Sequence, residues 1–427
     1  MNDPMFDWAV TVLLVTYGGI ISEKMPRVYV AMAGALLMII SGLVTQDMAV
    51  KEYIDFNTLG LLVGMMMIIA VARQSGIFEA MAVWAVKVTH GRAKVLLALL
   101  ALITAITSSI FDSVTAVLLL APMTISLARR LGIRPYPFLI MEVLMSNIGG
   151  TALMVGNPPN VMIGSATHLT FNDFFINLAP VVLLTMVVIV PMLLFIYRKD
   201  LKNQPIAIKV IEKLDYRSEI KNVSLLKKTL LVLTVTIMGF IVHSALGLQS
   251  ATVALTGAVI LLIITRADAA TAFSSVPWDT LFFFLGLFVV VGGLEAAGVI
   301  AYIAQWAFAM TSGDLVHTTF LVLWLSAFAS AIIDNIPFTA TMIPLIREMQ
   351  NLMGVNVDFL WWALALGACF GGNGTLIGAS PNLIIATIAD RAGYNFTFWN
   401  YTKVCFPLMV VSVLICHAYL YFRYMMF

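Results

Sequence analysis

The chain has 427 residues, of which 61% are hydrophobic and 11% are charged, and its mean hydropathy is +0.99. Soluble domains carry about 25% charged residues and about 45–50% apolar ones, so this composition excludes a soluble protein and predicts an all-α polytopic membrane protein. The formal net charge is +2, and because the basic residues lie in short loops, this charge does not indicate nucleic-acid binding. The sequence holds no Walker loop or His-Glu-x-x-His motif that would favour an ATP-driven pump or a hydrolase.

The first half of the chain predicts crossings that are interrupted by two shorter features. Residues 77–86 lie between two basic stretches, which predicts a helix at the cytoplasmic interface. Residues 95–128 are bracketed by Lys94 and Arg129 and are polar at their middle, which predicts a re-entrant hairpin open to the cytoplasm. The predicted crossings are residues 8–21, 28–44, 58–71, 138–164 and 174–197.

A basic segment divides the chain. Residues 198–228 hold nine of the 24 Lys and Arg residues against four acids, which places this segment in the cytoplasm. We therefore expect a first transmembrane repeat over residues 1–197, a cytoplasmic basic linker over residues 198–228, and a second transmembrane repeat over residues 229–427.

The second half repeats the first at a constant offset of 222 residues. Matched Gly, Pro and Asp residues are rarer coincidences than matched Leu or Val. Because each half has an odd number of predicted crossings, the second repeat is expected to be inverted, with a hairpin over residues 316–347 open to the outside. The aligned pairs include Asp112 with Asp334, Pro122 with Pro344, Gly149-Gly150 with Gly371-Gly372, and Pro159-Asn160 with Pro381-Asn382.

The two hairpin tips carry Asp112 and Asp334 beside Ser, Thr and Asn residues. A carboxylate at membrane depth costs at least a few kcal/mol, so it usually faces a cavity, a partner or a bound ion. Both aspartates therefore predict Na⁺ or H⁺ coupling. An alternative is that each aspartate only caps the helix that follows it, and the two roles are compatible.

Each half also contains a glycine- and proline-rich segment, at residues 147–160 and 371–382. Glycine costs a helix about 1 kcal/mol and proline about 3 kcal/mol, so these segments predict broken helices whose free backbone groups line a cavity. The expected helix-breaking glycines are Gly149, Gly150, Gly156, Gly371, Gly372, Gly374 and Gly378.

Side chains at the tips and breaks are the candidate site. Ion coupling is expected from Asp112, Asn147, Thr151, Asn160, Asp334, Asn373 and Asn382. Substrate contacts are expected from Ser108, Ser109, Thr115, Asn157, Ser330, Asn335, Thr339, Thr375 and Ser380. Asn160 and Asn382 fit either a turn amide or an ion ligand, and Glu142, whose repeat counterpart is Leu364, fits a structural or a coupling role. No cofactor is expected, and no metal other than Na⁺.

Four segments, residues 112–122, 147–161, 333–344 and 367–380, resemble the family of the melanosomal P protein and its prokaryotic relatives. That family belongs with the arsenite permeases and bacterial Na⁺/H⁺ antiporters in the ion transporter superfamily, which also includes divalent-anion/sodium symporters. The resemblance implies a secondary transporter with two inverted-topology repeats, each holding a re-entrant hairpin and a broken helix. By analogy with the superfamily it also implies a homodimer.

In the divalent-anion branch, Ser-Asn-Thr tips bind substrate carboxylates and Na⁺, and dimers work by an elevator movement. The present tips read Asp112-Ser-Val-Thr115 and Asp334-Asn-Ile-Pro337. The extra acid disfavours a dianionic substrate unless protons or cations neutralise its carboxylates. Dicarboxylate/Na⁺ symport is therefore less expected than transport of a cation, of a neutral oxyacid such as arsenite, or of a cation-coupled anion.

The leading interpretation is a secondary active transporter of ions or small anions, coupled to Na⁺ or H⁺, in a prokaryotic plasma membrane. Its partners would be membrane lipid and a small ion. Two alternatives on the same fold are a Na⁺/H⁺ antiporter and a passive anion channel, and uphill flux driven by a gradient distinguishes a carrier from a channel. An enzyme is disfavoured because no nucleophile–base or metal signature is present. The working hypothesis places two pseudo-symmetric ion sites beside one central substrate site.

Overall fold

The computed structural model describes residues 4–22, 24–90, 92–202, 214–354 and 356–426, and every regular element in them is helical. Among these residues, nine helices are long and apolar enough to span a membrane. The prediction of an all-α polytopic protein is confirmed. Residues 203–213 of the predicted linker lie outside the described residues, and the proposed division into two repeats and a cytoplasmic linker stays a prediction.

Within the described residues, the first half contains eleven α-helices and one π-helix. They are α1 (Pro4–Ser22), α2 (Arg27–Ile40), α3 (Gln46–Met48), η1 (Ala49–Tyr53), α4 (Phe56–Gln74), α5 (Ile77–Val88), α6 (Ala93–Phe111), α7 (Ser113–Leu131), α8 (Tyr136–Gly150), α9 (Pro158–Ala166), α10 (Phe171–Ile196) and α11 (Arg198–Lys202). The second half contains α13 (Val223–Val242), α14 (Ser250–Thr265), α15 (Ala269–Ser274), α16 (Trp278–Ala296), α17 (Val299–Met310), α18 (Leu315–Ile332), α19 (Asn335–Met353), α20 (Asp358–Gly371), α21 (Ser380–Arg391), α22 (Phe398–Leu420) and η2 (Tyr421–Met425).

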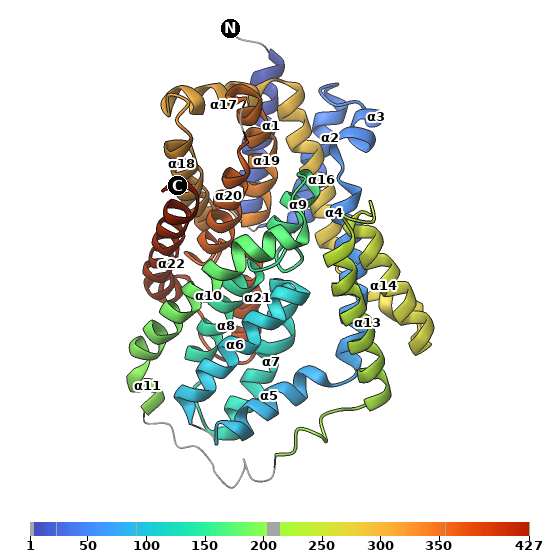
Figure 1. Ribbon diagram of the computed structural model, residues 1–427, viewed down its shortest axis with the longest axis vertical. Helices are drawn as coiled ribbons and strands as arrows, with labels where there is room; N and C mark the ends of the chain where they lie inside the picture. The colour runs from blue at the N-terminus through green and yellow to red at the C-terminus, as the bar shows by residue number, and fades with distance from the viewer. Residues whose placement is uncertain (1–3, 23, 91, 203–213, 355, 427) are drawn as a thin grey trace.

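The helices reproduce the 222-residue offset of the sequence. The same shift maps the bounds of α4 onto α16, of α5 onto α17 and of α7 onto α19 without a residue of difference. The short helices α5 and α17 lie at opposite ends of the molecule, α5 at the bottom and α17 at the top of Figure 1. The second repeat is therefore inverted relative to the first, as predicted.

Both stretches that were predicted to be re-entrant are helix pairs that break at an aspartate. Asp112 separates α6 from α7 with a φ of 87°, and Asp334 precedes α19. A positive φ is uncommon outside glycine, and the Asp112 carboxylate offsets it by accepting hydrogen bonds from the first amides of α7. Neither stretch is one continuous crossing, so the two hairpins are confirmed, and the side of the membrane to which each opens stays a prediction.

The predicted broken helices are also present. α8 ends at Gly150 and α9 begins at Pro158, while α20 ends at Gly371 and α21 begins at Ser380. In the first break a Cβ on Gly150 would lie 2.5 Å from the carbonyl oxygen of Gly156. The loop closes so tightly on itself that a residue with a side chain would force it open.

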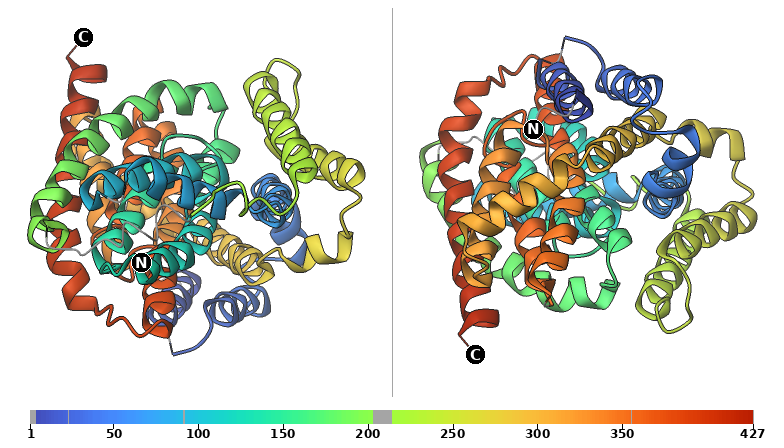
Figure 2. Two further views of the ribbon diagram at one scale, coloured as in Figure 1. Left: turned by 90° about the horizontal axis from the view of Figure 1, so that it is seen from below. Right: turned by 90° about the horizontal axis from the view of Figure 1, so that it is seen from above.

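The helices form two bodies. α1, α2, α4, α13, α14 and α16, here called the scaffold, are packed together, and α2, α4, α13, α14 and α16 gather along one side in Figures 1 and 2. The hairpins and broken helices, with α10 and α22, form the other body, here called the hairpin body.

The repeats interleave within the scaffold. α4 of the first repeat packs on α14 of the second, where a Cβ on Gly64 would lie 2.6 Å from the Ala254 backbone. Its counterpart α16 packs on α2, where a Cβ on Gly286 would lie 2.7 Å from the Ala31 backbone. Small residues allow this close backbone approach between membrane helices.

Candidate functional site

The first hairpin tip satisfies its aspartate from within. The carboxylate of Asp112 is 4% exposed. One of its oxygens accepts hydrogen bonds from the amides of Val114 (2.7 Å) and Thr115 (3.2 Å), and the other accepts from the Thr115 hydroxyl (2.6 Å). Next to it, the Ser113 hydroxyl donates to the side-chain carbonyl of Asn157 (3.0 Å) and ties the tip to the break of its own repeat.

The second tip is satisfied differently. Asp334 is 1% exposed, and one of its oxygens accepts from the amide of Ile336 (3.1 Å). The other oxygen accepts from a guanidinium nitrogen of Arg27 (2.5 Å) and from the hydroxyl of Ser380 (2.8 Å). The position equivalent to Thr115 is Pro337, which has neither an amide hydrogen nor a hydroxyl to donate. The second carboxylate therefore takes its donors from other helices.

Asparagines from the two broken helices meet at the centre. The amide nitrogen of Asn147 donates to the side-chain oxygens of Asn373 (2.8 Å) and Asn382 (3.1 Å), which belong to the other repeat. Asn382 in turn donates to the carbonyls of Gly372 (2.7 Å) and Thr375 (2.8 Å), and its counterpart Asn160 donates to those of Thr151 (2.9 Å) and Leu153 (3.0 Å). The two asparagines thus hold the breaks in shape.

Among the described residues, two polar atoms of this region have no hydrogen-bond partner. They are the side-chain oxygen of Asn147 and the side-chain nitrogen of Asn157, and both residues are at most 1% exposed. Buried polar atoms are nearly always paired, so an unpaired acceptor and an unpaired donor mark places for an ion, a substrate or water. The Asn147 amide is oriented by its nitrogen, which faces the side-chain oxygens of Asn373 and Asn382.

The remaining predicted residues bind backbone. The hydroxyls of Ser108 and Ser330 donate to the carbonyls of Ser146 (2.5 Å) and Ala368 (2.6 Å), and these two equivalent bonds link α6 to α8 and α18 to α20. Thr375 donates to the Ala331 carbonyl, and the Asn335 amide donates to the Gly378 carbonyl (3.2 Å). Ser109, Thr151 and Thr339 donate to carbonyls of their own helices.

The predicted helix-breaking glycines lie at close contacts. A Cβ on Gly149 or Gly371 would meet the backbone of α6 or α18, and one on Gly374 would lie 2.9 Å from the Cβ of Ala331. Gly150, Gly156, Gly372 and Gly378 pair with one another across the two break loops.

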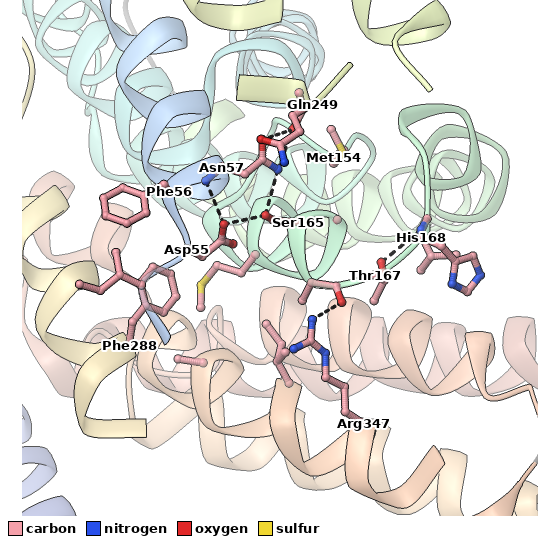
Figure 3. A pocket seen from close by; sticks show the side chains of 18 of the residues that line it. Asp55, Phe56, Asn57, Met154, Ser165, Thr167, His168, Gln249, Phe288 and Arg347 are labelled. Atoms are coloured by element: carbon pink, nitrogen blue, oxygen red, sulfur yellow. Dashed lines mark hydrogen bonds between the residues drawn. The ribbon is translucent and has the colours of Figure 1, made fainter. Parts of the chain in front are cut away.

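A cavity of about 690 Å³ lies where α9 and α19 of the hairpin body face α4, α14 and α16 of the scaffold. None of the residues predicted for the site lines it. Its wall carries a contact between the two bodies, drawn in Figure 3. The Ser165 hydroxyl of α9 donates to the carboxylate of Asp55 (2.8 Å) and accepts from the side-chain amide of Asn57 (2.9 Å). Within the hairpin body, Arg347 of α19 donates to the Ala166 carbonyl of α9.

Glu142 lies apart from these groups, within the hairpin body. Its carboxyl accepts a hydrogen bond from Thr124 of α7, and its second oxygen is buried without a partner among the residues that the structure describes. Leu364 and Ile346 occupy the equivalent positions of the second repeat.

Two inverted repeats, paired hairpin tips and two broken helices meeting at a polar centre define a polytopic secondary-transporter fold. The chain belongs to the family described as CitMHS, citrate transporter, whose model matches residues 17–367. It is a transporter and not an enzyme.

Relatives match the chain over nearly its full length. It is 40% identical to an uncharacterized transporter of Mycobacterium tuberculosis over 97% of this chain and 98% of that protein. It is 33% identical to the human P protein over 96% of this chain, which corresponds to 59% of that longer protein. The resemblance stated from the sequence is confirmed.

A solved structure shares the fold. The YdaH transporter of Alcanivorax borkumensis, whose structure is described as having an unusual topology, aligns with a TM-score of 0.59 over 88% of this chain and 87% of that chain. The two sequences are 15% identical, so this likeness concerns the fold alone.

Several contact residues were not anticipated from the sequence. Arg27 was not among the residues predicted for the site, yet its guanidinium binds the second tip. The Tyr17 hydroxyl also reaches that hairpin, where it bonds the Pro337 carbonyl (2.7 Å) and the Thr341 hydroxyl (2.6 Å). Asp55 and Ser165 were likewise unforeseen. The available signal was the departure from the repeat at Pro337, which removes donors from the second tip.

Proposed function

We propose that the protein is a secondary active transporter that moves a small anion coupled to Na⁺ or H⁺. The substrate would bind at the asparagine centre between the broken helices, and the coupling cation would bind at the aspartate tips. The cavity between the two bodies would be the aqueous approach from the face opposite residues 198–228. The membrane would be a prokaryotic plasma membrane.

The observation that carries this proposal is the pair of unpartnered polar atoms in the buried asparagine region. Asn147 offers an acceptor and Asn157 a donor, and the Asn147 side chain already bridges the two repeats through Asn373 and Asn382. A ligand held there would lie where the broken helices of the two inverted repeats meet, which is the usual position of a transporter's substrate site.

The position of Arg27 changes the electrostatic argument against anionic substrates. The sequence suggested two uncompensated acids at the tips, whereas the Arg27 guanidinium compensates Asp334 at 2.5 Å. Among the described residues, Asp112 is then the tip aspartate that has no cation at salt-bridge distance. A substrate that carries carboxylates therefore meets one uncompensated acid, whereas the sequence suggested two. The family description names citrate, so we propose citrate as the first substrate to test, with arsenite as the neutral comparison.

The test is uptake by proteoliposomes under imposed Na⁺ and pH gradients. We expect accumulation of labelled substrate above its equilibrium level with one gradient, and loss of that accumulation when the coupling carboxylate is removed, in Asp334→Asn, in Asp112→Asn or in both, provided that the proteins still fold. Asn preserves size and most capping hydrogen bonds but removes the charge. Flux that only runs downhill would favour a channel, and unchanged coupling in both variants would reduce the aspartates to helix caps.

The homodimer implied by the resemblance stays a prediction. A mass measurement in detergent and in lipid nanodiscs checks it, and a monomer in both would contradict it.

A further inference from the structure

The two aspartate tips occupy equivalent positions but are compensated in opposite ways. Asp112 receives three hydrogen bonds from its own hairpin. Asp334 receives one from its own hairpin and two from outside it, including the guanidinium of Arg27. Arg27 also donates a hydrogen bond to the hydroxyl of Ser380 (3.2 Å). It therefore contacts both the second hairpin tip and the broken helix of the same repeat.

Three paired differences between the repeats produce this asymmetry. Where the first repeat has Thr115, the second has Pro337, which removes two donors from the tip. Where the first has Pro158 at the start of its second half-helix, the second has Ser380, which supplies a hydroxyl. The first-repeat residue Arg27 corresponds to Gln249, which carries no charge.

The ion pair also joins the two bodies. Arg27 is the first residue of α2 in the scaffold, whereas Asp334 caps α19 in the hairpin body. Tyr17 of α1 adds a second link from the scaffold to the same hairpin. Sliding of one body past the other beyond the reach of the Arg27 side chain parts Arg27 from Asp334 and leaves a buried carboxylate without its cation, which is strongly unfavourable unless another cation replaces it.

We propose that Arg27 is a tethered counter-ion, which competes with the coupling cation for the Asp334 carboxylate and leaves that carboxylate when the cation binds. This inference rests on the proposed ion coupling and assigns it chiefly to Asp334. Asp112 is satisfied by its own tip in any position of the hairpin body, so it acts as a cap. Asp334 instead exchanges partners between an internal cation, Arg27, and an external one.

The exchange predicts how Arg27 variants bind the cation. If Arg27 holds the carboxylate in about nine of ten molecules, its removal raises the apparent cation affinity about tenfold, because the competent fraction rises from about 0.1 to nearly 1. Arg27→Gln should therefore bind the cation about tenfold more tightly. Arg27→Lys, which retains the charge, should stay close to the unmodified protein.

The measurement is thermal unfolding of the purified full chain in detergent, titrated with NaCl against choline chloride at constant ionic strength, and repeated as a pH series in choline chloride. The matched control is Lys24→Gln, which removes a base from the same α1–α2 turn at an exposed position. Asp334→Asn should abolish the dependence on the cation, and Asp112→Asn should lower stability but leave the half-saturating concentration unchanged.

The outcomes separate this inference from the proposed function. If Arg27→Gln and the unmodified protein titrate alike while Asp334→Asn loses the response, Asp334 is the ion site but Arg27 does not compete there. If Asp334→Asn keeps the full response, or if no variant responds to Na⁺ or pH, the assignment of coupling to Asp334 fails together with the competition. Should Arg27→Gln not fold, the exchanged pair Arg27→Asp with Asp334→Arg decides. A merely structural ion pair would regain both stability and cation response in the exchanged protein, whereas a tethered counter-ion regains stability without the response.

Discussion

Replacement of Gly371 by alanine tests the close approach that brings the second hairpin against its broken helix. A Cβ at this position would lie 2.3 Å from the carbonyl oxygen and 2.5 Å from the Cα of Ala327 in α18. Both are backbone atoms, so no rotamer change relieves the overlap, and α18 and α20 must separate by roughly 1 Å to restore ordinary contact.

The expected magnitude follows from two opposing effects. Adding a methyl group to a packed interior costs about 1–3 kcal/mol, and replacing glycine in a helix returns at most about 1 kcal/mol. Because Gly371 is the last residue of α20, little of that return is available. We expect Gly371→Ala to lower the free energy of unfolding by about 1–2 kcal/mol.

The assay is thermal unfolding in detergent followed by tryptophan fluorescence. The matched control is Gly18→Ala in the interior of α1, where a Cβ would meet no atom within 4 Å, so this variant should melt at or above the temperature of the unmodified protein. Gly149→Ala repeats the test in the first repeat, since its Cβ would lie 2.3 Å from the Cα of Ala105. Equal melting of Gly371→Ala and Gly18→Ala would show that the helices do not approach this closely.

Three further substitutions test other contacts. Asn382→Ala leaves the carbonyls of Gly372 and Thr375 without their donor, so it should cost about 2 kcal/mol or more in the same melting assay, whereas the exposed Asn351→Ala should cost nothing measurable. Glu142→Gln keeps the size of the side chain and an acceptor for Thr124, and Leu364 fills the equivalent position of the second repeat. We therefore expect the free energy of unfolding to fall by less than about 1 kcal/mol and transport to be retained in full. Loss of gradient-driven uptake would instead assign Glu142 to coupling. Ser165→Ala removes both hydrogen bonds that join α9 to Asp55 and Asn57, at about 1 kcal/mol each. Spin labels on α9 and α14 should then report a second distance between the two bodies. An unchanged distance distribution would show that these hydrogen bonds do not hold the two bodies together.

The sequence was sufficient for the hairpins, the breaks and the inversion because their signals are local. Asp112 and Gly150 interrupt helices through backbone chemistry that acts within a few residues, and the 222-residue offset transfers each interruption to the second half. These features needed no knowledge of which helices touch. For the same reason, the capping role of Asp112 could be offered as an alternative from its position at the tip.

The partners of Asp334 were not predictable in the same way. Arg27 lies 307 residues earlier in the chain, and a base that follows an apolar helix ordinarily marks a cytoplasmic turn. Only the packing of the scaffold on the hairpin body brings the two charges together. The cavity beside Ser165 depends on the same packing of scaffold against hairpin body, so sequence patterns that identify single helices could not locate it.

The interleaved scaffold makes the two halves of this chain interdependent, like the subunits of an obligate dimer. α4 of the first half is covered by α14 of the second, and α16 of the second by α2 of the first, through equivalent contacts at Gly64 and Gly286. Each half made alone would expose a glycine-lined face shaped for the missing partner, and obligate partners have no stable isolated form. Fragments comprising residues 1–202 and 214–427 should therefore be degraded when produced singly and should reassemble when produced together.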